Sequence, residues 1–108
     1  MLLTPSPQTL KKYGLSEEEW RGMADKQGHV CFVCRLPPKK GRLHIDHDHV
    51  KGWKAMPPEK RKLHVRGLLC FWCNTRLLGR SINVEKAKNV LLYLEEHRDR
   101  INSLLQKQ

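Results

Sequence analysis

The chain has 108 residues, 39% of them hydrophobic and 30% charged, a composition that excludes a membrane span and fits one small soluble domain. Lysine and arginine number 21 against 11 aspartates and glutamates, so the formal net charge is +10. This excess favours a polyanionic partner, usually nucleic acid, over a protein that is merely basic, although charge does not separate DNA from RNA. Prolines follow Met1 so closely that no signal peptide is predicted, and we expect an intracellular, cytoplasmic location.

Two segments precede the first cysteine. Residues 1–12 contain prolines and lysines without periodicity and predict a mobile basic arm. Ser16 and Glu19 have the spacing of a capping box, and Gly28 has the position of a helix stop, so a helix is predicted over residues 17–27. The apolar residues that share one face of this helix are Trp20, Met23 and Ala24.

The middle of the chain predicts two strands and a short helix. Leu43 to Ile45 is a strand candidate, and residues 65–69 form a second one. The polar, basic stretch between them, over residues 50–65, predicts a flexible loop. Residues 74–78 predict a short helix that Gly79 ends.

The C-terminal part, residues 81–108, predicts one long amphipathic helix. Its apolar stripe could pack back on the preceding core, over residues 13–80, or form part of a homodimer interface, so both monomer and homodimer stay open. The stripe consists of Val84, Ala87, Val90, Leu91, Leu94, Ile101, Leu104 and Leu105.

All the cysteines fall in two CxxC pairs. Two intervening residues let both thiolates of a pair point into one tetrahedral zinc site, and two pairs complete a closed structural site. Disulfides are disfavoured inside cells, and a redox CxxC would not need a second copy. We therefore predict one structural Zn²⁺ that staples a thin core, bound by Cys31, Cys34, Cys70 and Cys73.

Between the pairs lies a cluster of histidines and aspartates, His44-Ile45-Asp46-His47-Asp48-His49. Adjacent residues of a regular strand point to opposite faces, so Asp46 and His47 share a site only if the strand ends or twists there. The Asp46 carboxylate suits Mg²⁺ or Mn²⁺, and a neutral imidazole suits proton abstraction from water. A solvated polar loop or a set of auxiliary zinc ligands are the alternatives.

Asn74 directly follows the last cysteine and begins the predicted short helix. Its ordinary role there is an N-cap. Because zinc would hold this helix beside the strand, the Asn74 amide oxygen is also a candidate second metal ligand opposite Asp46.

Taken together, CxxC, LxxDHDH and RGLLCxxCN resemble the endonuclease VII group of the HNH superfamily. The matching stretches are Cys31–Cys34, Leu43–His49 and Arg66–Asn74, and Tyr13-Gly14-Leu15-Ser16 is also similar. The resemblance implies an α+β fold with a ββα-metal (HNH/His-Me finger) core, here zinc-stapled and flanked by an N-terminal helix and a long C-terminal helix. It covers residues 31–74 most specifically.

The resemblance also implies a phosphodiester hydrolase that leaves 5′-phosphate and 3′-hydroxyl ends. A divalent ion would be held by Asp46 and Asn74, His47 would be the general base, and His49 would position the substrate or contact the phosphate. A phage origin, and with it the cytoplasm of a host cell, is also implied. Family enzymes that resolve branched DNA act as dimers.

The chain departs from the family pattern in two places. The stretch between His49 and Arg66 is longer than expected, and we expect it to be either a DNA-contacting loop or a solvated basic loop. Leu77 stands where an acidic residue is expected in a junction resolvase, which weakens the transfer of junction specificity. The candidate phosphate contacts are Lys51, Lys54, Lys60, Arg61, Lys62 and Arg66.

The leading hypothesis is therefore a metal-dependent DNA endonuclease that cuts duplex or branched DNA with low sequence specificity. A dimeric Holliday-junction resolvase and a non-catalytic, zinc-stabilised DNA-binding module are the alternatives. An RNA-binding zinc ribbon has less support, since only 6% of the residues are aromatic and no stacking platform is evident.

Overall fold

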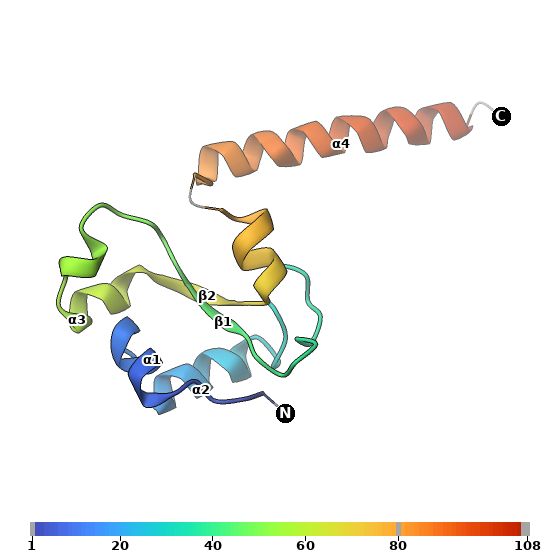
Figure 1. Cartoon of the computed structure of the whole chain (residues 1–108). Helices are drawn as coiled ribbons and strands as arrows, with labels where there is room; N and C mark the ends of the chain where they lie inside the picture. Colours follow the sequence, from blue (N-terminus) through green and yellow to red (C-terminus); the bar gives the residue numbers. More distant parts are fainter. Residues whose placement is uncertain (1, 80, 107–108) are drawn as a thin grey trace.

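The computed structural model describes residues 2–79 and 81–106, and it shows a small α+β protein built around a two-stranded sheet (Figure 1). The predicted core boundary at residue 80 and residues 107–108 of the predicted C-terminal helix lie outside the described residues. The elements in chain order are α1 (Pro7–Tyr13), α2 (Glu17–Lys26), β1 (His44–His47), the 3-10 turn η1 (Trp53–Ala55), α3 (Pro58–Arg61), the 3-10 turn η2 (Lys62–His64), β2 (Val65–Leu69), the π-type turn η3 (Cys73–Leu77) and α4 (Val84–Gln106).

Helix α1 stands where the sequence predicted part of a mobile arm, so the arm prediction is wrong for this stretch. The Ser6 side chain accepts a hydrogen bond from the Thr9 backbone N–H at 3.2 Å, and Pro7 follows at the start of the helix, where its fixed φ is favourable. Leu10 is buried in the core. The sequence does not predict this helix because about two turns with one buried residue show no periodicity.

The helix predicted over residues 17–27 is confirmed as α2, one residue shorter. Both hydrogen bonds of the capping box are present, from Glu19 N–H to Ser16 Oγ and from Ser16 N–H to Glu19 Oε1, each at 3.0 Å. Trp20 and Ala24 are buried against the sheet, and Gly28 follows with a φ of +70° that favours glycine. Because α2 is packed in the core, the backbone that follows it reaches Cys31 from a fixed position.

Gln27 joins α2 to the sheet through side-chain hydrogen bonds that the sequence did not predict. Its side chain is buried, and its Nε2 donates to the carbonyl oxygens of Val30 at 3.0 Å and Leu68 at 2.9 Å. Its Oε1 accepts from the Leu68 N–H at 3.0 Å. One amide side chain thus satisfies both backbone groups of Leu68, as a neighbouring strand would do.

The two strands pair antiparallel with one irregularity that bears on the site. Ile45 lies opposite Leu68 and Asp46 opposite Gly67, but His47 lies opposite Val65. Arg66 is therefore an extra residue on β2, a bulge that twists the pair locally. The bulge falls between Asp46 and His47, at the point where the sequence required the strand to twist or end.

The stretch predicted as a flexible loop between the strands, residues 50–65, instead contains η1, α3 and η2, and its last residue begins β2. Trp53 is buried, with 6% of its surface exposed. The end of the segment is joined to β1, because the Asp48 N–H donates to the His64 carbonyl at 2.9 Å and the two side chains also bond at 2.9 Å. We call residues 50–64 the inserted segment. The sequence does not predict these elements, because turns this short leave no periodic pattern.

Contact between α1 and α3 requires glycine at position 14. Gly14 has a φ of +71°, and a Cβ built there would collide with the Pro58 carbonyl oxygen and lie 2.8 Å from its carbonyl carbon. We expect Gly14→Ala to lower the free energy of unfolding by about 2 to 5 kcal/mol, from the left-handed conformation plus overpacking. Gly22→Ala is the control, since a Cβ there meets nothing within 4 Å in α2. Gly22→Ala is expected to raise the free energy of unfolding by about 0.5 to 1 kcal/mol in the same urea titration. Equal effects of the two variants would contradict the assigned contact.

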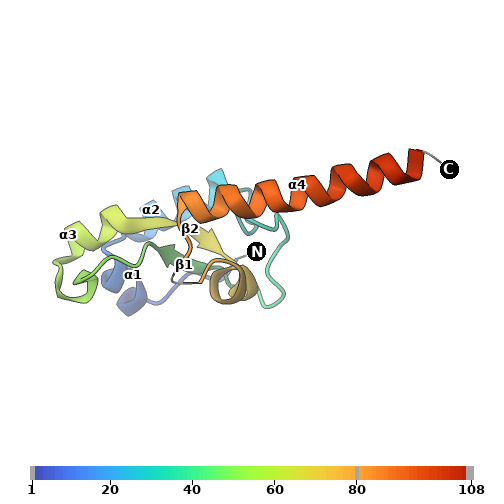
Figure 2. The same cartoon turned by 90° about the horizontal axis from the view of Figure 1, so that it is seen from above.

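Helix α4 lies apart from the sheet in Figure 1, and it extends well beyond the sheet in both views (Figures 1 and 2). None of its described residues is buried, so its apolar stripe does not pack back on the core, which was one of the two predicted arrangements. The homodimer interface stays a prediction. Within residues 2–79 and 81–106, no helix has the length and apolarity needed to cross a membrane.

Candidate zinc site and active site

The four cysteines of the two CxxC pairs lie together, with their sulfur atoms all within 4.8 Å of one another. Cys34 Sγ and Cys70 Sγ are 3.9 Å apart, close to the edge of about 3.8 Å that four Zn–S bonds of ~2.3 Å impose on a tetrahedron. The Cys73 N–H points at Cys70 Sγ at 3.4 Å. The donor set therefore fits a single tetrahedral zinc ion, as the sequence predicted.

The first CxxC pair, Cys31 and Cys34, is joined directly to β2. Cys31 is fully buried, and the next residue, Phe32, donates its N–H to the Leu68 carbonyl at 3.2 Å. Burial raises the pKa of Cys31, but backbone N–H groups directed at its sulfur outweigh burial and bring the pKa to about 7. The chain thus favours a thiolate here. The amides are those of Cys70, Cys34 and Val33.

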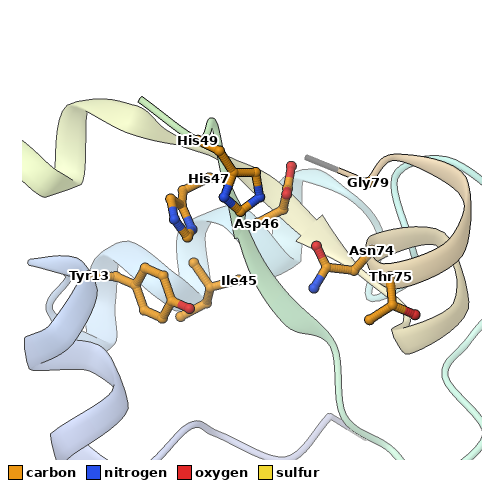
Figure 3. Close-up of a pocket in the computed structure, with 8 residues that line it drawn as sticks. All are labelled: Tyr13, Ile45, Asp46, His47, His49, Asn74, Thr75 and Gly79. Carbon is orange, nitrogen blue, oxygen red and sulfur yellow. The ribbon is translucent and has the colours of Figure 1, made fainter. Parts of the chain in front are cut away.

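A cavity of about 290 Å³ opens on one side of the sheet between β1 and η3 (Figure 3). It brings together the four residues that the sequence singled out for catalysis, Asp46, His47, His49 and Asn74. Asp46 and Asn74 extend into it from different elements, β1 and η3. The remaining lining residues are Tyr13, Ile45, Thr75 and Gly79.

Asp46 is the buried charge of this pocket, with 4% of its surface exposed. Its carboxylate accepts two hydrogen bonds from Arg66, from Nε at 2.7 Å and from Nη2 at 3.1 Å. This bidentate pair raises the pKa of Arg66. The bulge positions the guanidinium, so the sequence could not have foreseen the pair. Arg66 was predicted as a phosphate contact, a role that stays a prediction beside the observed one.

The pair gives Arg66 a measurable role in stability. In metal-free buffer, Arg66→Ala leaves a buried carboxylate without its partner, and we expect the free energy of unfolding to fall by about 2 kcal/mol. Mn²⁺ should restore more stability to this variant than to wild type, because the ion neutralises the same carboxylate. Arg76→Ala, on the exposed side of η3, is the control in both titrations. Equal stability of the two variants in metal-free buffer would contradict the assigned role of the pair.

His47 lies in a half-buried, largely aromatic environment. Its ring is stacked on Trp53, with ring centroids 4.0 Å apart and an interplanar angle of 21°, and it lies 4.7 Å from His49. Burial and then the neighbouring His49 charge lower the pKa of His47, against a smaller opposing effect of Asp46. A neutral imidazole, which can accept a proton, is therefore favoured near neutral pH.

Tyr13 reaches the pocket from the end of α1 and was not among the predicted site residues. Its ring centroid lies 5.6 Å from that of His47. Burial, followed by the charge of Asp46, raises the pKa of Tyr13, so its hydroxyl stays protonated. The sequence indicated only that this segment resembles the family. Asp48 also differs from the simple cluster picture, because its side chain bonds His64 and does not line the pocket.

The predicted phosphate contacts of the inserted segment divide into two groups. Lys51, Lys54 and Lys60 are exposed. Lys62 forms an ion pair with Glu19, and Arg61 Nη1 donates to the Lys12 carbonyl at 2.9 Å. The structure therefore assigns internal partners to Arg61 and Lys62, and contact of any of the five with DNA stays a prediction.

Comparison with known proteins gives one family. The model of the recombination endonuclease VII family matches residues 6–100. The chain belongs to the recombination endonuclease VII family. Its resemblance to this group, carried by the CxxC and DHDH motifs, is thus confirmed, and the match includes α1, α2 and most of α4 as well as the motifs.

Two phage proteins are similar to this endonuclease VII family member. The Gene 59 protein of Mycobacterium phage D29 is 35% identical over 89 residues, which are 81% of this chain and 47% of the phage protein. The Gene 59 protein of Mycobacterium phage L5 is 37% identical over 87 residues, 79% of this chain and 46% of the phage protein. The chain therefore spans about half the length of these relatives. No solved structure matches it significantly.

Proposed function

We propose that this member of the endonuclease VII family is an HNH-type DNA endonuclease that hydrolyses phosphodiester bonds and leaves 5′-phosphate and 3′-hydroxyl ends. The observation that carries the proposal is the convergence of Asp46, His47 and Asn74 on one pocket beside four clustered cysteines. The order β1, β2, η3, with the pocket between strand and turn, supports a ββα-metal core.

Within this proposal, four polar residues of the pocket take part in the reaction. His47 accepts the proton of the attacking water, for which its neutral form is suited. Asp46 and Asn74 offer a carboxylate and an amide oxygen, the ligand types that Mg²⁺ and Mn²⁺ prefer, and when bound such an ion supplies positive charge to the phosphate and the leaving 3′ oxygen. His49, exposed at the rim, contacts the phosphate.

We further propose that the substrate is duplex or branched DNA, bound through its phosphates with low sequence specificity. The net charge of +10 and the exposed lysines of the inserted segment support this mode of binding. Such contacts position the duplex and weaken with salt. Cleavage should therefore decline as ionic strength rises, without a change in the sites that are cut.

A cleavage assay tests the proposal. The purified protein is incubated with a labelled four-way junction, a linear duplex and a supercoiled plasmid, with Mg²⁺ or with EDTA, and its zinc content is measured after each condition. Products that require Mg²⁺ while zinc stays bound would support an endonuclease, and preference for the junction would favour a resolvase. DNA binding in a gel shift without any cleaved DNA, despite bound zinc, would refute the endonuclease proposal and favour a non-catalytic DNA-binding module.

A further inference from the structure

We propose that Trp53 is a positioning residue that holds the imidazole of His47 in its working orientation. The inference rests on the proposed function, because it takes His47 as the general base. It concerns a residue of the inserted segment, which lies outside the stretches that carry the CxxC, DHDH and RGLLC motifs. The inserted segment would then serve the reaction from within the protein, in addition to any contact with DNA.

The first argument is the geometry of the rings. The centroid distance of 4.0 Å and the angle of 21° between His47 and Trp53 are those of a stacked pair. Tyr13 lies 5.6 Å from His47 and 5.5 Å from Trp53, so the three rings contact one another. His49 closes a further side at 4.7 Å, with its ring tilted by 54°.

The second argument is that, within the described part of the chain, no hydrogen bond restrains the His47 ring. A catalytic imidazole is commonly oriented by a hydrogen bond to its second nitrogen, and rotation about χ2 is otherwise soft. Among residues 2–79 and 81–106, the ring hydrogen bonds of histidines involve His29, His64 and His97. For His47, packing against Trp53 therefore takes the place of the usual hydrogen bond.

The third argument is that Trp53 itself is held firmly. It is 6% exposed, and the guanidinium carbon of Arg61 lies 5.6 Å from its ring centroid. Arg61 is in turn bonded to the Lys12 carbonyl of α1. The indole N–H is buried without a partner among the described residues, so the ring is fixed by contacts on its faces and not by its polar edge.

The test compares Trp53→Leu, which removes the aromatic face, with Trp53→Phe, which retains one, and uses the exposed Trp72→Leu as control. NMR of the whole, zinc-bound protein without DNA is the first readout. In wild type, the indole ring current should shift the His47 ring protons upfield, and nuclear Overhauser contacts should join the two rings. The shift should vanish in Trp53→Leu, persist in part in Trp53→Phe and stay unchanged in Trp72→Leu.

Steady-state cleavage is the second readout. Trp53→Leu should lower kcat by roughly 10- to 100-fold with KM within about twofold, because misplacing a catalytic group costs rate and not binding. Trp53→Phe should recover most of kcat. Wild-type levels of kcat in Trp53→Leu, beside an inactive His47→Ala, would overturn the positioning role alone.

The two readouts separate the inference from the proposed function. Absence of ring contacts in wild-type protein overturns the inference whatever the activity, and this measurement needs no variant to fold. A wild-type protein that cleaves no DNA overturns the proposed function, while the resonances still decide whether Trp53 orients the ring.

Discussion

Replacement of His47 by alanine is expected to slow Mg²⁺-dependent DNA cleavage by about a thousandfold, the middle of the range for loss of a general acid or base. The ring lies at the end of β1, on the wall of the pocket that also contains Asp46 and Asn74. Its removal takes away the proton acceptor but leaves the zinc cysteines and the Arg66 pair in place. DNA binding in a gel shift should therefore change little.

The matched control is His97→Ala, which removes an exposed imidazole from α4. Both variants are prepared identically and followed on the same labelled duplex in a single-turnover assay, so that product release does not mask the chemical step. Cleavage by His47→Ala at a rate close to that of His97→Ala would contradict the assigned mechanism. Loss of zinc or of thermal stability in His47→Ala would show that the variant is not a clean test.

Loss of one zinc ligand is expected to have the largest effect on folding. Binding of a structural zinc ion contributes about 10 to 16 kcal/mol in small zinc domains, which is as large as the whole stability of a typical domain, about 5 to 15 kcal/mol. Cys34 is exposed, so Cys34→Ser removes a ligand without opening a cavity in the core. We expect this variant to bind little zinc and to lose its cooperative thermal transition by circular dichroism.

Val33→Ser provides the control, because it introduces the same hydroxyl at the neighbouring, partly exposed position and leaves all four thiols. It should bind one zinc ion per chain and melt near the wild-type temperature. A cooperative transition in Cys34→Ser, at a temperature close to that of Val33→Ser and without bound metal, would refute the zinc staple.

The parts of the site that the sequence predicted share one property: their chemistry depends on spacing along the chain. Two residues between sulfurs suffice to form a knuckle, and the four sulfurs do lie together. The capping box of Ser16 and Glu19 is likewise local, and it is present. The sequence also predicted the grouping of Asp46, His47 and Asn74 in one pocket, because two CxxC pairs that meet at one point leave little freedom for β1 and η3.

The residues that escaped prediction act across the chain and are of types without a local pattern. Trp53 and Tyr13 are separated by 40 positions, and their contact with His47 depends on how α1 and the inserted segment pack. Gln27 satisfies the backbone of Leu68, 41 residues away. Polar side chains such as that of Gln27 are usually exposed, so the sequence did not predict a buried glutamine here. The family resemblance could not help with Trp53, since it lies in the extra stretch.

The bulge at Arg66 also sets the phase of β2 relative to β1. With one extra residue, β2 places Gly67 opposite Asp46 and Val65 opposite His47, while Leu69 stays opposite His44 and Cys70 follows at the four-cysteine end. Without the bulge, Arg66 would lie opposite His47, and Val65 and Gly67 would share one face, as alternate residues of a regular strand do. The bulge instead pairs Val65, which directly follows the inserted segment, with His47. A single extra residue of β2 thus fits the four-cysteine end of the strand pair and its His47 end into one sheet.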